Sequence, residues 1–219
     1  MQFVFLVSPN ELGSNSSPSI KWSRDSKLLA LFGNNNSTLI YDRNGNKIAT
    51  IPVANPNLMD WDSNNQLIAI TSSDSHDITL YNFQTNEVNT INAPFVPTWI
   101  SFTKSRSFLV AGSDKGKFWI WDRKSQQSQT YQGTHCMKIV DGAWNTKKQL
   151  VLCSEDHSIS VNSIRGETVA RYEIDDVPCF PHFVKIDNRF VLIFSSSSKP
   201  VVYIWEFNNE NKITQIPFS

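Results

Sequence analysis

One seven-residue pattern recurs five times along this chain of 219 residues, and a repeat at a fixed period constrains a fold more strongly than any single motif. In each copy a bulky residue is followed, six positions later, by the first residue of an apolar run, with mostly polar residues between them. The bulky residues are Trp22, Trp61, Phe102, Trp144 and Val184, and the runs begin at Leu28, Leu67, Phe108, Leu150 and Phe190. Successive bulky residues are 39, 41, 42 and 40 positions apart, close to the roughly 40–45 residues of a four-stranded propeller blade.

The apolar run of each copy is continuous, which is typical of a strand covered on both faces. The runs are Leu28–Phe32, Leu67–Ile70, Phe108–Ala111, Leu150–Cys153 and Phe190–Phe194. A second β-favouring segment follows each run after a turn rich in Asn, Ser, Asp and Gly, and a more polar segment closes the unit. Each unit therefore predicts four strands, and the apolar run predicts a strand packed between neighbouring blades.

These units predict an all-β chain, a β-propeller of about five four-stranded blades in a single domain over residues 1–219. The repeats lie near residues 18–53, 57–92, 97–132, 139–173 and 181–217, and residues 1–7 are predicted to form an extra N-terminal strand. An open row of blades leaves apolar faces in water, so something must cover them. We expect an incomplete, open part of a larger propeller. The alternatives are a five-bladed ring closed by Met1–Val7, or completion by a partner.

The seven tryptophans suit either a packed core or an aromatic binding surface. Five of them hold repeat positions, either the bulky position or the third predicted strand, and we expect these in the core. They are Trp22, Trp61, Trp121, Trp144 and Trp205. The repeat does not fix Trp99 and Trp119, and exposed aromatic residues often anchor protein interfaces. Trp99 and Trp119 are therefore the predicted partner-binding residues.

Charge and composition argue against several classes of protein. Lys and Arg together number 20, as do Asp and Glu, and no dense basic run is present, so nucleic acid is not an expected partner. No apolar stretch approaches the roughly 20 residues that span a bilayer, so no transmembrane segment is expected. The cysteines Cys136, Cys153 and Cys179 are odd in number and form no CxxC pair, which is typical of reduced thiols in an intracellular protein.

No residues have the spacing of a catalytic or metal site. The four histidines are scattered, and none lies at ligand spacing from a cysteine or another histidine. A phosphate-binding loop and a nucleophile elbow are both missing from the sequence. We therefore predict no enzymatic activity, no cofactor and no metal. His135 follows Gly133 and Thr134, and the similarity of this segment to the Gly-His pair of many WD repeats implies that its imidazole is a hydrogen-bonded brace within a blade.

The segment Trp119–Asp122 ends in the Trp-Asp dipeptide of WD repeats, and Gly133–His135 is similar to the Gly-His pair that many WD repeats carry. Between about Ile20 and Phe183 the chain resembles the N-terminal WD-repeat β-propeller of the large WD-repeat subunit of intraflagellar transport complex A. The resemblance rests on the order and spacing of Tyr41–Lys47, Met59–Asp62, Trp144–Asn145, Ser154–Asn162 and Gly166–Val169. Members of that family are longer, with a second propeller and a helical solenoid.

The resemblance implies a non-enzymatic protein-binding scaffold that acts in retrograde ciliary transport. It also implies a role, with a tubby-like adaptor, in the import of membrane proteins into cilia. The implied partners are other subunits of complex A, and the implied locations are the cytoplasm, the cilium and the ciliary base.

Two alternative functions stay open. One is a WD-repeat scaffold of a coat or vesicle-trafficking complex, which the identity of its partners would distinguish from the ciliary scaffold. The other is a propeller enzyme with a site in the central channel, which measurable turnover would support.

Overall fold

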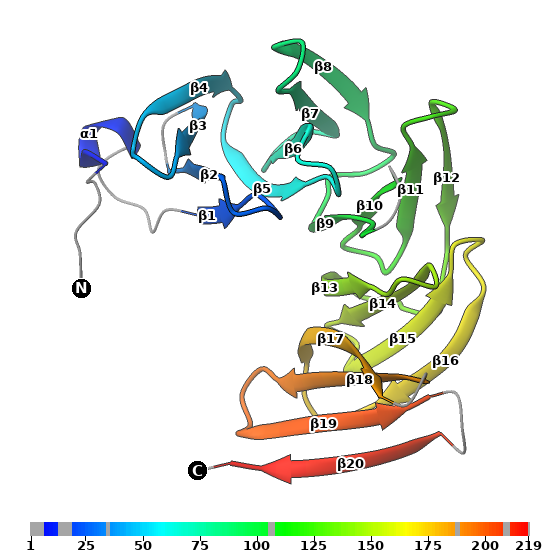
Figure 1. The fold of residues 1–219 in the computed structure, drawn as a ribbon. Helices are drawn as coiled ribbons and strands as arrows, with labels where there is room; N and C mark the ends of the chain where they lie inside the picture. Colours follow the sequence, from blue (N-terminus) through cyan, green and yellow to red (C-terminus); the bar gives the residue numbers. More distant parts are fainter. Residues whose placement is uncertain are drawn as a thin grey trace. The chain divides into compact units, whose positions relative to one another are not determined.

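The computed structural model describes residues 7–12, 19–33, 36–104, 108–186, 189–207 and 211–218, and nearly all regular structure in these ranges is β-strand. One short helix, α1 (Pro9–Leu12), precedes twenty strands. The strands form five antiparallel sheets of four, and each sheet follows the order of the chain (Figure 1). The prediction of an all-β chain with five four-stranded blades is confirmed.

The sheets begin and end within three residues of the predicted repeat boundaries. The first sheet has β1 (Ser19–Trp22), β2 (Leu28–Phe32), β3 (Ser37–Asp42) and β4 (Lys47–Pro52), and the second has β5 (Pro56–Trp61), β6 (Leu67–Ser72), β7 (Asp77–Asn82) and β8 (Glu87–Asn92). The third has β9 (Trp99–Phe102), β10 (Phe108–Gly112), β11 (Phe118–Asp122) and β12 (Gln127–Tyr131), and the fourth has β13 (Ile139–Trp144), β14 (Gln149–Ser154), β15 (Ser158–Ser163) and β16 (Thr168–Glu173). The fifth has β17 (Pro178–Ile186), β18 (Arg189–Ser196), β19 (Val201–Glu206) and β20 (Lys212–Pro217).

The chain divides into two compact units, unit 1 (Met1–Phe102) and unit 2 (Thr103–Ser219). The single domain over residues 1–219 stays a prediction. Of the predicted extra strand over residues 1–7, only Val7 is described, and it belongs to no strand.

In unit 1 the first and second sheets pack face to face around Trp61. The buried residues of this core are Ala30, Phe32, Ile40, Ile51, Val53, Met59, Trp61, Ile68, Ile70 and Tyr81. Trp61 is 1% exposed, and its Nε1 donates a hydrogen bond of 3.1 Å to the carbonyl of Lys21 in β1. Burying a large apolar side chain stabilises a fold by about 1.5–3 kcal/mol, provided that its polar atoms keep partners. The indole therefore joins the two sheets both by packing and by a hydrogen bond.

The core prediction for the repeat tryptophans is right for four and wrong for one. The four buried ones are Trp61, Trp121, Trp144 and Trp205. Trp22 is 46% exposed. Trp61 is covered because the first sheet lies against it, whereas no described sheet precedes β1. Val7 and Leu12 pack over Leu31 and Leu39 on this face of the first sheet, but Trp22 stays open to solvent.

The fourth copy of the seven-residue pattern is offset by one residue in the structure. The bulky residues and their strand partners are Trp22 with Leu29, Trp61 with Ile68, and Trp144 with Leu150. Because neighbouring residues of a strand point to opposite faces, Leu150 shares the face of its bulky residue, whereas Leu28 lies opposite to Trp22. The cause is a turn that is one residue shorter, closed between Asn145 and Gln149 where the first sheet closes between Ser23 and Leu28. The predicted equivalence of the five runs is therefore wrong for Leu150.

The fifth copy is also displaced by one residue. In unit 2 the fourth and fifth sheets share a core, and the bulky residue of β17 that enters it is Phe183, which pairs with Leu192. Val184, the predicted bulky residue, points to the opposite face. The β17–β18 hairpin continues until Ile186 pairs with Arg189, so its connection differs in length from the other inner hairpins. The predicted bulky residue of the fifth repeat is thus wrong, and Phe183 takes its place.

Gly166 provides a test of the packing in unit 2. It has a φ of 82°, and a Cβ built on it would lie 1.9 Å from Cδ1 of Tyr131. We expect Gly166→Ala to lower the free energy of unfolding by about 2–4 kcal/mol, because the methyl group must displace the ring and the backbone is left-handed. Denaturant unfolding measures the loss. Gly45 has the same φ in the corresponding β3–β4 turn, so Gly45→Ala gives the backbone contribution alone. Equal losses for the two variants would contradict the packing of Tyr131 against this turn.

Candidate functional site

Asp60 is the centre of a polar cluster in unit 1 at the end of the inner strands. It is 4% exposed, and its Oδ2 accepts a hydrogen bond of 2.6 Å from the backbone N–H of Phe102. Its Oδ1 lies 2.8 Å from Nζ of Lys21, and its Oδ2 lies 3.6 Å from Nη2 of Arg24. A buried carboxylate is tolerated where hydrogen bonds and opposite charges satisfy it, as they do here. These residues are called the Asp60 cluster below.

Arg24 extends the Asp60 cluster across three sheets. It lies in the turn after β1, and the turn is held by the Ser23 hydroxyl, which accepts from the backbone N–H of Leu28. From this turn the guanidinium donates to the carbonyl of Trp61 at 3.2 Å and to that of Phe102 at 3.1 Å. A planar group with several fixed donors suits such a bridge between carbonyls. The Asp60 cluster therefore fixes the ends of β1, β5 and β9 relative to one another.

His135 is the centre of a second polar network, in unit 2. The imidazole is 3% exposed, and its Nδ1 lies 3.2 Å from each carboxylate oxygen of Asp156. Its Nε2 lies 2.7 Å from the hydroxyl of Ser160, and that hydroxyl accepts from the side-chain amide of Asn162 at 2.8 Å. Asp156 also accepts from the hydroxyl of Ser158. The interpretation of His135 as a hydrogen-bonded brace is confirmed, and the brace joins the segment before β13 to β15.

Burial favours the neutral form of His135, whereas hydrogen bonds keep Asp156 charged. Desolvation lowers the pKa of His135 below 6.5, although the Asp156 carboxylate acts in the opposite direction. The pKa of Asp156 is lowered, because hydrogen bonds from Ser158, His135 and the backbone N–H of Cys136 outweigh the effect of burial. With a neutral imidazole, Nδ1–H donates to Asp156 and Nε2 accepts from Ser160. This arrangement holds a turn in place, and the hydroxyls beside the imidazole are buried with it.

The two predicted partner-binding tryptophans are both buried. Trp99, at the start of β9, is 8% exposed, and Trp119, in β11, is 3% exposed. They lie on different strands. Binding through either ring would require the residues around it to move. Their role in partner binding stays a prediction.

Unit 2 also has an open groove of about 460 Å³ between the third and fourth sheets. Apolar side chains of Phe108, Ile120, Tyr131 and Ile164 line it together with polar residues of β12 and with the charged side chains of Asp122 and Lys148. The sequence pattern predicts neither this groove nor the Asp60 cluster, because each forms from residues of different repeats. The only sequence signal for Asp60 is a carboxylate directly before a repeat tryptophan.

Within the described ranges of the chain, no three His, Cys, Asp or Glu side chains are close enough to bind a metal ion together. The single helix in these ranges is too short to cross a bilayer.

Five four-stranded sheets that repeat every 39 to 42 residues, with a Trp-Asp end on β11 and a His-Asp-Ser brace in the fourth sheet, define a WD-repeat β-propeller protein. The sequence profile of the family "WDR19 first beta-propeller" matches residues 18–218, and the chain belongs to this family. The resemblance to the first propeller of the large WD-repeat subunit of intraflagellar transport complex A is confirmed.

Individual relatives agree with the family. WD repeat-containing protein 19 of Mus musculus is 26% identical over 207 residues, which cover 90% of this chain and 15% of the relative. WD repeat-containing protein dyf-2 of Caenorhabditis elegans is 24% identical over 159 residues, covering 68% of this chain and 11% of the relative. Dihydro-heme d1 dehydrogenase NirN superposes with a TM-score of 0.74 at 14% identity, covering 92% of this chain and 46% of NirN, which shows a shared fold alone. This chain thus spans a small fraction of its named relatives.

The Asp60 cluster predicts a stability effect in unit 1. We expect Asp60→Ala to lower the free energy of unfolding by about 1–3 kcal/mol, because the buried N–H of Phe102 loses its acceptor. Lys21 and Arg24 are partly exposed and can be hydrated again, which limits the loss. Urea unfolding of the full chain measures it. Glu173→Ala removes an exposed partner of Arg171 and is expected to change nothing measurable. If both variants unfolded at the same urea concentration, the cluster would not stabilise the fold.

His135 predicts a pH dependence of stability. Its pKa in the folded chain is below 6.5, so the unfolded chain binds the proton more readily and stability falls as the pH drops from 7 through this value. The slope from one group is at most about 1.4 kcal/mol per pH unit. We expect His135→Gln to lower stability at pH 7 and to remove this part of the slope between pH 7 and 5. Chemical unfolding at a series of pH values tests it, and an unchanged slope would exclude His135 as its source.

Proposed function

We propose that this chain is part of a non-enzymatic protein-binding scaffold of intraflagellar transport complex A, acting in retrograde ciliary transport and in the import of membrane proteins into cilia. The family match over residues 18–218 carries the proposal, because it includes all five sheets. The chain spans only 15% and 11% of the relatives described above, so their whole-protein roles come to it as part of the proposal.

The buried polar residues favour a structural task over catalysis. Asp60 is engaged by a backbone N–H and two cations, and His135 by a carboxylate and a buried hydroxyl. A catalytic group needs access to a substrate atom in addition to a suitable pKa. Both groups instead fix strand ends and turns, and a rigid set of turns and outer strands is the kind of surface that repeat proteins offer to partners.

The proposed partners are other subunits of complex A and a tubby-like adaptor. The proposed locations are the cytoplasm, the ciliary base and the cilium. Protein partners suit the equal numbers of acidic and basic residues in the chain, which do not favour binding to nucleic acid.

Affinity purification from ciliated cells tests the proposal. The tagged chain, expressed at low level, is expected to recover complex A subunits above the amount recovered by a WD propeller of similar size that has no ciliary role. A destabilised variant, Gly166→Ala, serves as a second bait, and its recovery should fall in proportion to its folded fraction. Recovery of coat or vesicle-trafficking subunits in place of complex A would contradict the ciliary role and would favour a trafficking scaffold.

A further inference from the structure

The outer strand of the third sheet, β12, has an unprotected edge. Each sheet ends in an outer strand that pairs on one side only, and natural proteins usually place charges or prolines on such strands to prevent pairing with another chain. The protecting residues are Lys47 and Pro52 in β4, Glu87 in β8, Arg171 and Glu173 in β16, and Lys212 and Pro217 in β20. In contrast, β12 reads Gln-Ser-Gln-Thr-Tyr, with neither a charge nor a proline. Among the five outer strands, β12 is therefore the one most open to pairing with an added strand.

Although one edge of β12 is unpaired, the strand is held in place by its pairing with β11 and by Tyr131. Its first four residues are exposed, but Tyr131 at its end is partly buried and stacks on Phe118, with ring centroids 5.2 Å apart and planes at 28°. The β15–β16 turn approaches the same ring so closely at Gly166 that no side chain fits there. An extended peptide would meet a strand that is already ordered, which lowers the entropy lost on binding.

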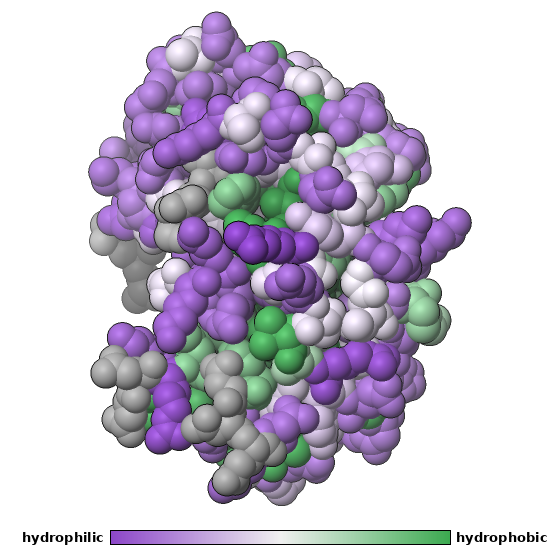
Figure 2. Space-filling view, turned by 90° about the vertical axis from the view of Figure 1, so that its right-hand side faces the viewer, coloured by the Kyte–Doolittle hydropathy of each residue, from purple (hydrophilic) through white to green (hydrophobic). Residues whose placement is uncertain are grey.

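A groove runs beside β12 and offers pockets for side chains. Its volume is about 460 Å³, and its apolar lining comes from Phe108, Ile120 and Tyr131 of the third sheet and Ile164 of the fourth. Figure 2 looks onto the side of the molecule that carries β12 and shows hydrophobic side chains set between hydrophilic ones. In strand addition, main-chain hydrogen bonds along an edge supply affinity and pockets for alternate side chains supply specificity. The edge of β12 and this groove provide both.

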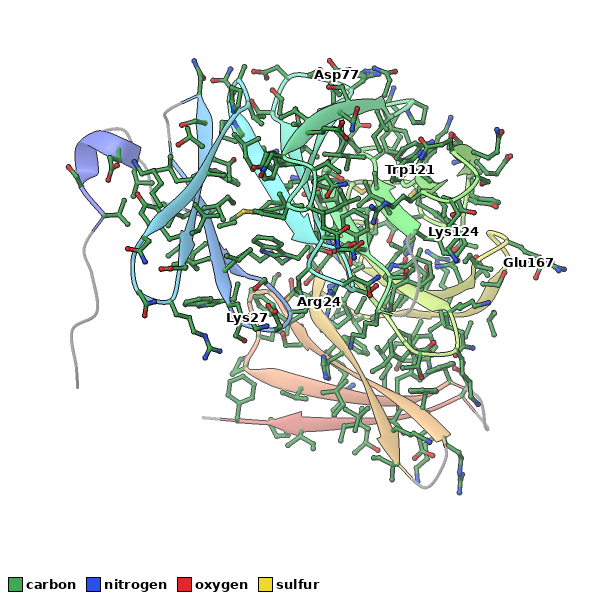
Figure 3. The ribbon with its side chains drawn as sticks, turned by 45° about the horizontal axis from the view of Figure 1, so that its top comes forward. Arg24, Lys27, Asp77, Trp121, Lys124 and Glu167 are labelled. Carbon is green, nitrogen blue, oxygen red and sulfur yellow. The ribbon has the colours of Figure 1, made fainter. Side chains whose placement is uncertain are left out.

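The charge around the groove favours an acidic ligand. Lys124 lies in the β11–β12 turn, Lys148 lines the groove, and Arg165 directly follows Ile164. Within the described residues none of these three cations forms an ion pair with a carboxylate. Two carboxylates lie near the groove and both have local partners. Asp122, which also lines the groove, accepts from the Lys124 backbone N–H and the Ser125 hydroxyl, and Glu167 accepts from the Ser163 hydroxyl. Figure 3 shows Lys124 and Glu167 projecting from turns of neighbouring sheets of unit 2. Lys124, Lys148 and Arg165 are called the basic rim.

We propose that β12 and the adjoining groove bind an extended acidic and apolar segment of a partner protein, which joins the third sheet as a fifth strand. Apolar side chains of the segment enter the groove, and its carboxylates pair with the basic rim. An uncharged strand edge does not suit a nucleic acid or a lipid surface, both of which need a broad basic face. The proposal is independent of the ciliary role, because it uses only the geometry and charge of unit 2.

A peptide pool tests the chemistry of the ligand. The probe is a fluorescent pool of ten-residue peptides that alternate Asp or Glu with Leu, Ile, Val or Phe, titrated with the full chain and followed by anisotropy. We expect binding with a dissociation constant below about 100 μM, and at least tenfold weaker binding of the same pool with Lys and Arg in place of the acids. Absence of binding at about 1 mM, or equal binding of both pools, would overturn the proposal.

A second experiment tests strand addition without altering the protein. Alternate backbone nitrogens of the best-binding peptide are methylated in two complementary sets. An added strand uses only the N–H groups on one edge, so one set should abolish binding and the other should leave it within about threefold. Equal effects of both sets would show that the peptide does not extend the sheet.

Charge reversal locates the site. Lys148→Glu should weaken binding of the acidic pool at least tenfold, whereas Lys27→Glu, the same change in an exposed turn of unit 1, should not (Figure 3). Thermal unfolding confirms that both variants fold. Equal affinities of the two variants would place binding elsewhere. Binding of anionic lipid vesicles that Lys148→Glu abolishes, with no binding of the peptides, would assign the basic rim to a membrane and contradict the proposal.

Discussion

The structure depends on the burial of sheet faces against one another. A blade has two apolar faces, and the central strands of each sheet point large side chains to both sides, so no sheet is complete alone. Trp61 shows how this requirement is met, since its ring is covered by the first sheet and its indole N–H bonds to that sheet's inner strand. Trp22 shows the reverse case, in which the corresponding ring has no described sheet against it and stays exposed.

Apolar packing is not directional, so it does not by itself determine how the strands and turns are positioned. Hydrogen bonds in the two buried polar networks determine these positions. The Asp60 cluster ties three strand ends through one carboxylate and one guanidinium, and the His135 network ties a connecting segment to a turn and a strand. Each buried polar atom in them has a partner, which is why they cost little to bury and tolerate few substitutions. These networks make the turns and strand edges rigid, and a binding surface needs both.

Much of the fold could be predicted from the sequence because a blade repeats its hydrophobic pattern locally. The period, the number of sheets and the strand boundaries follow from positions such as Trp61 and Trp144. The errors in strand register have one physical origin, because the averaged pattern does not include the length of each turn, whereas Trp22 is exposed because no described sheet covers it. Because its turn is one residue shorter, Leu150 lies on the same face as Trp144. Because the β17–β18 hairpin is longer, Phe183 and not Val184 is the bulky residue that enters the core. The Asp60 cluster and the groove each contain residues from different blades, and a pattern within one blade does not predict contacts between blades.

The register offsets mean that the five blades are not interchangeable parts. Aligned by their sequence pattern, Leu28 and Leu150 appear to be the same residue, yet one shares the face of its tryptophan and the other does not. If a strand were duplicated or designed without its own turn, its buried side chains would point to the opposite face of the sheet. The turn must therefore be copied together with the strand. The structural unit of this chain is therefore the hairpin together with its turn. The length of the turn determines which residues are buried as much as the apolar residues of the two strands do.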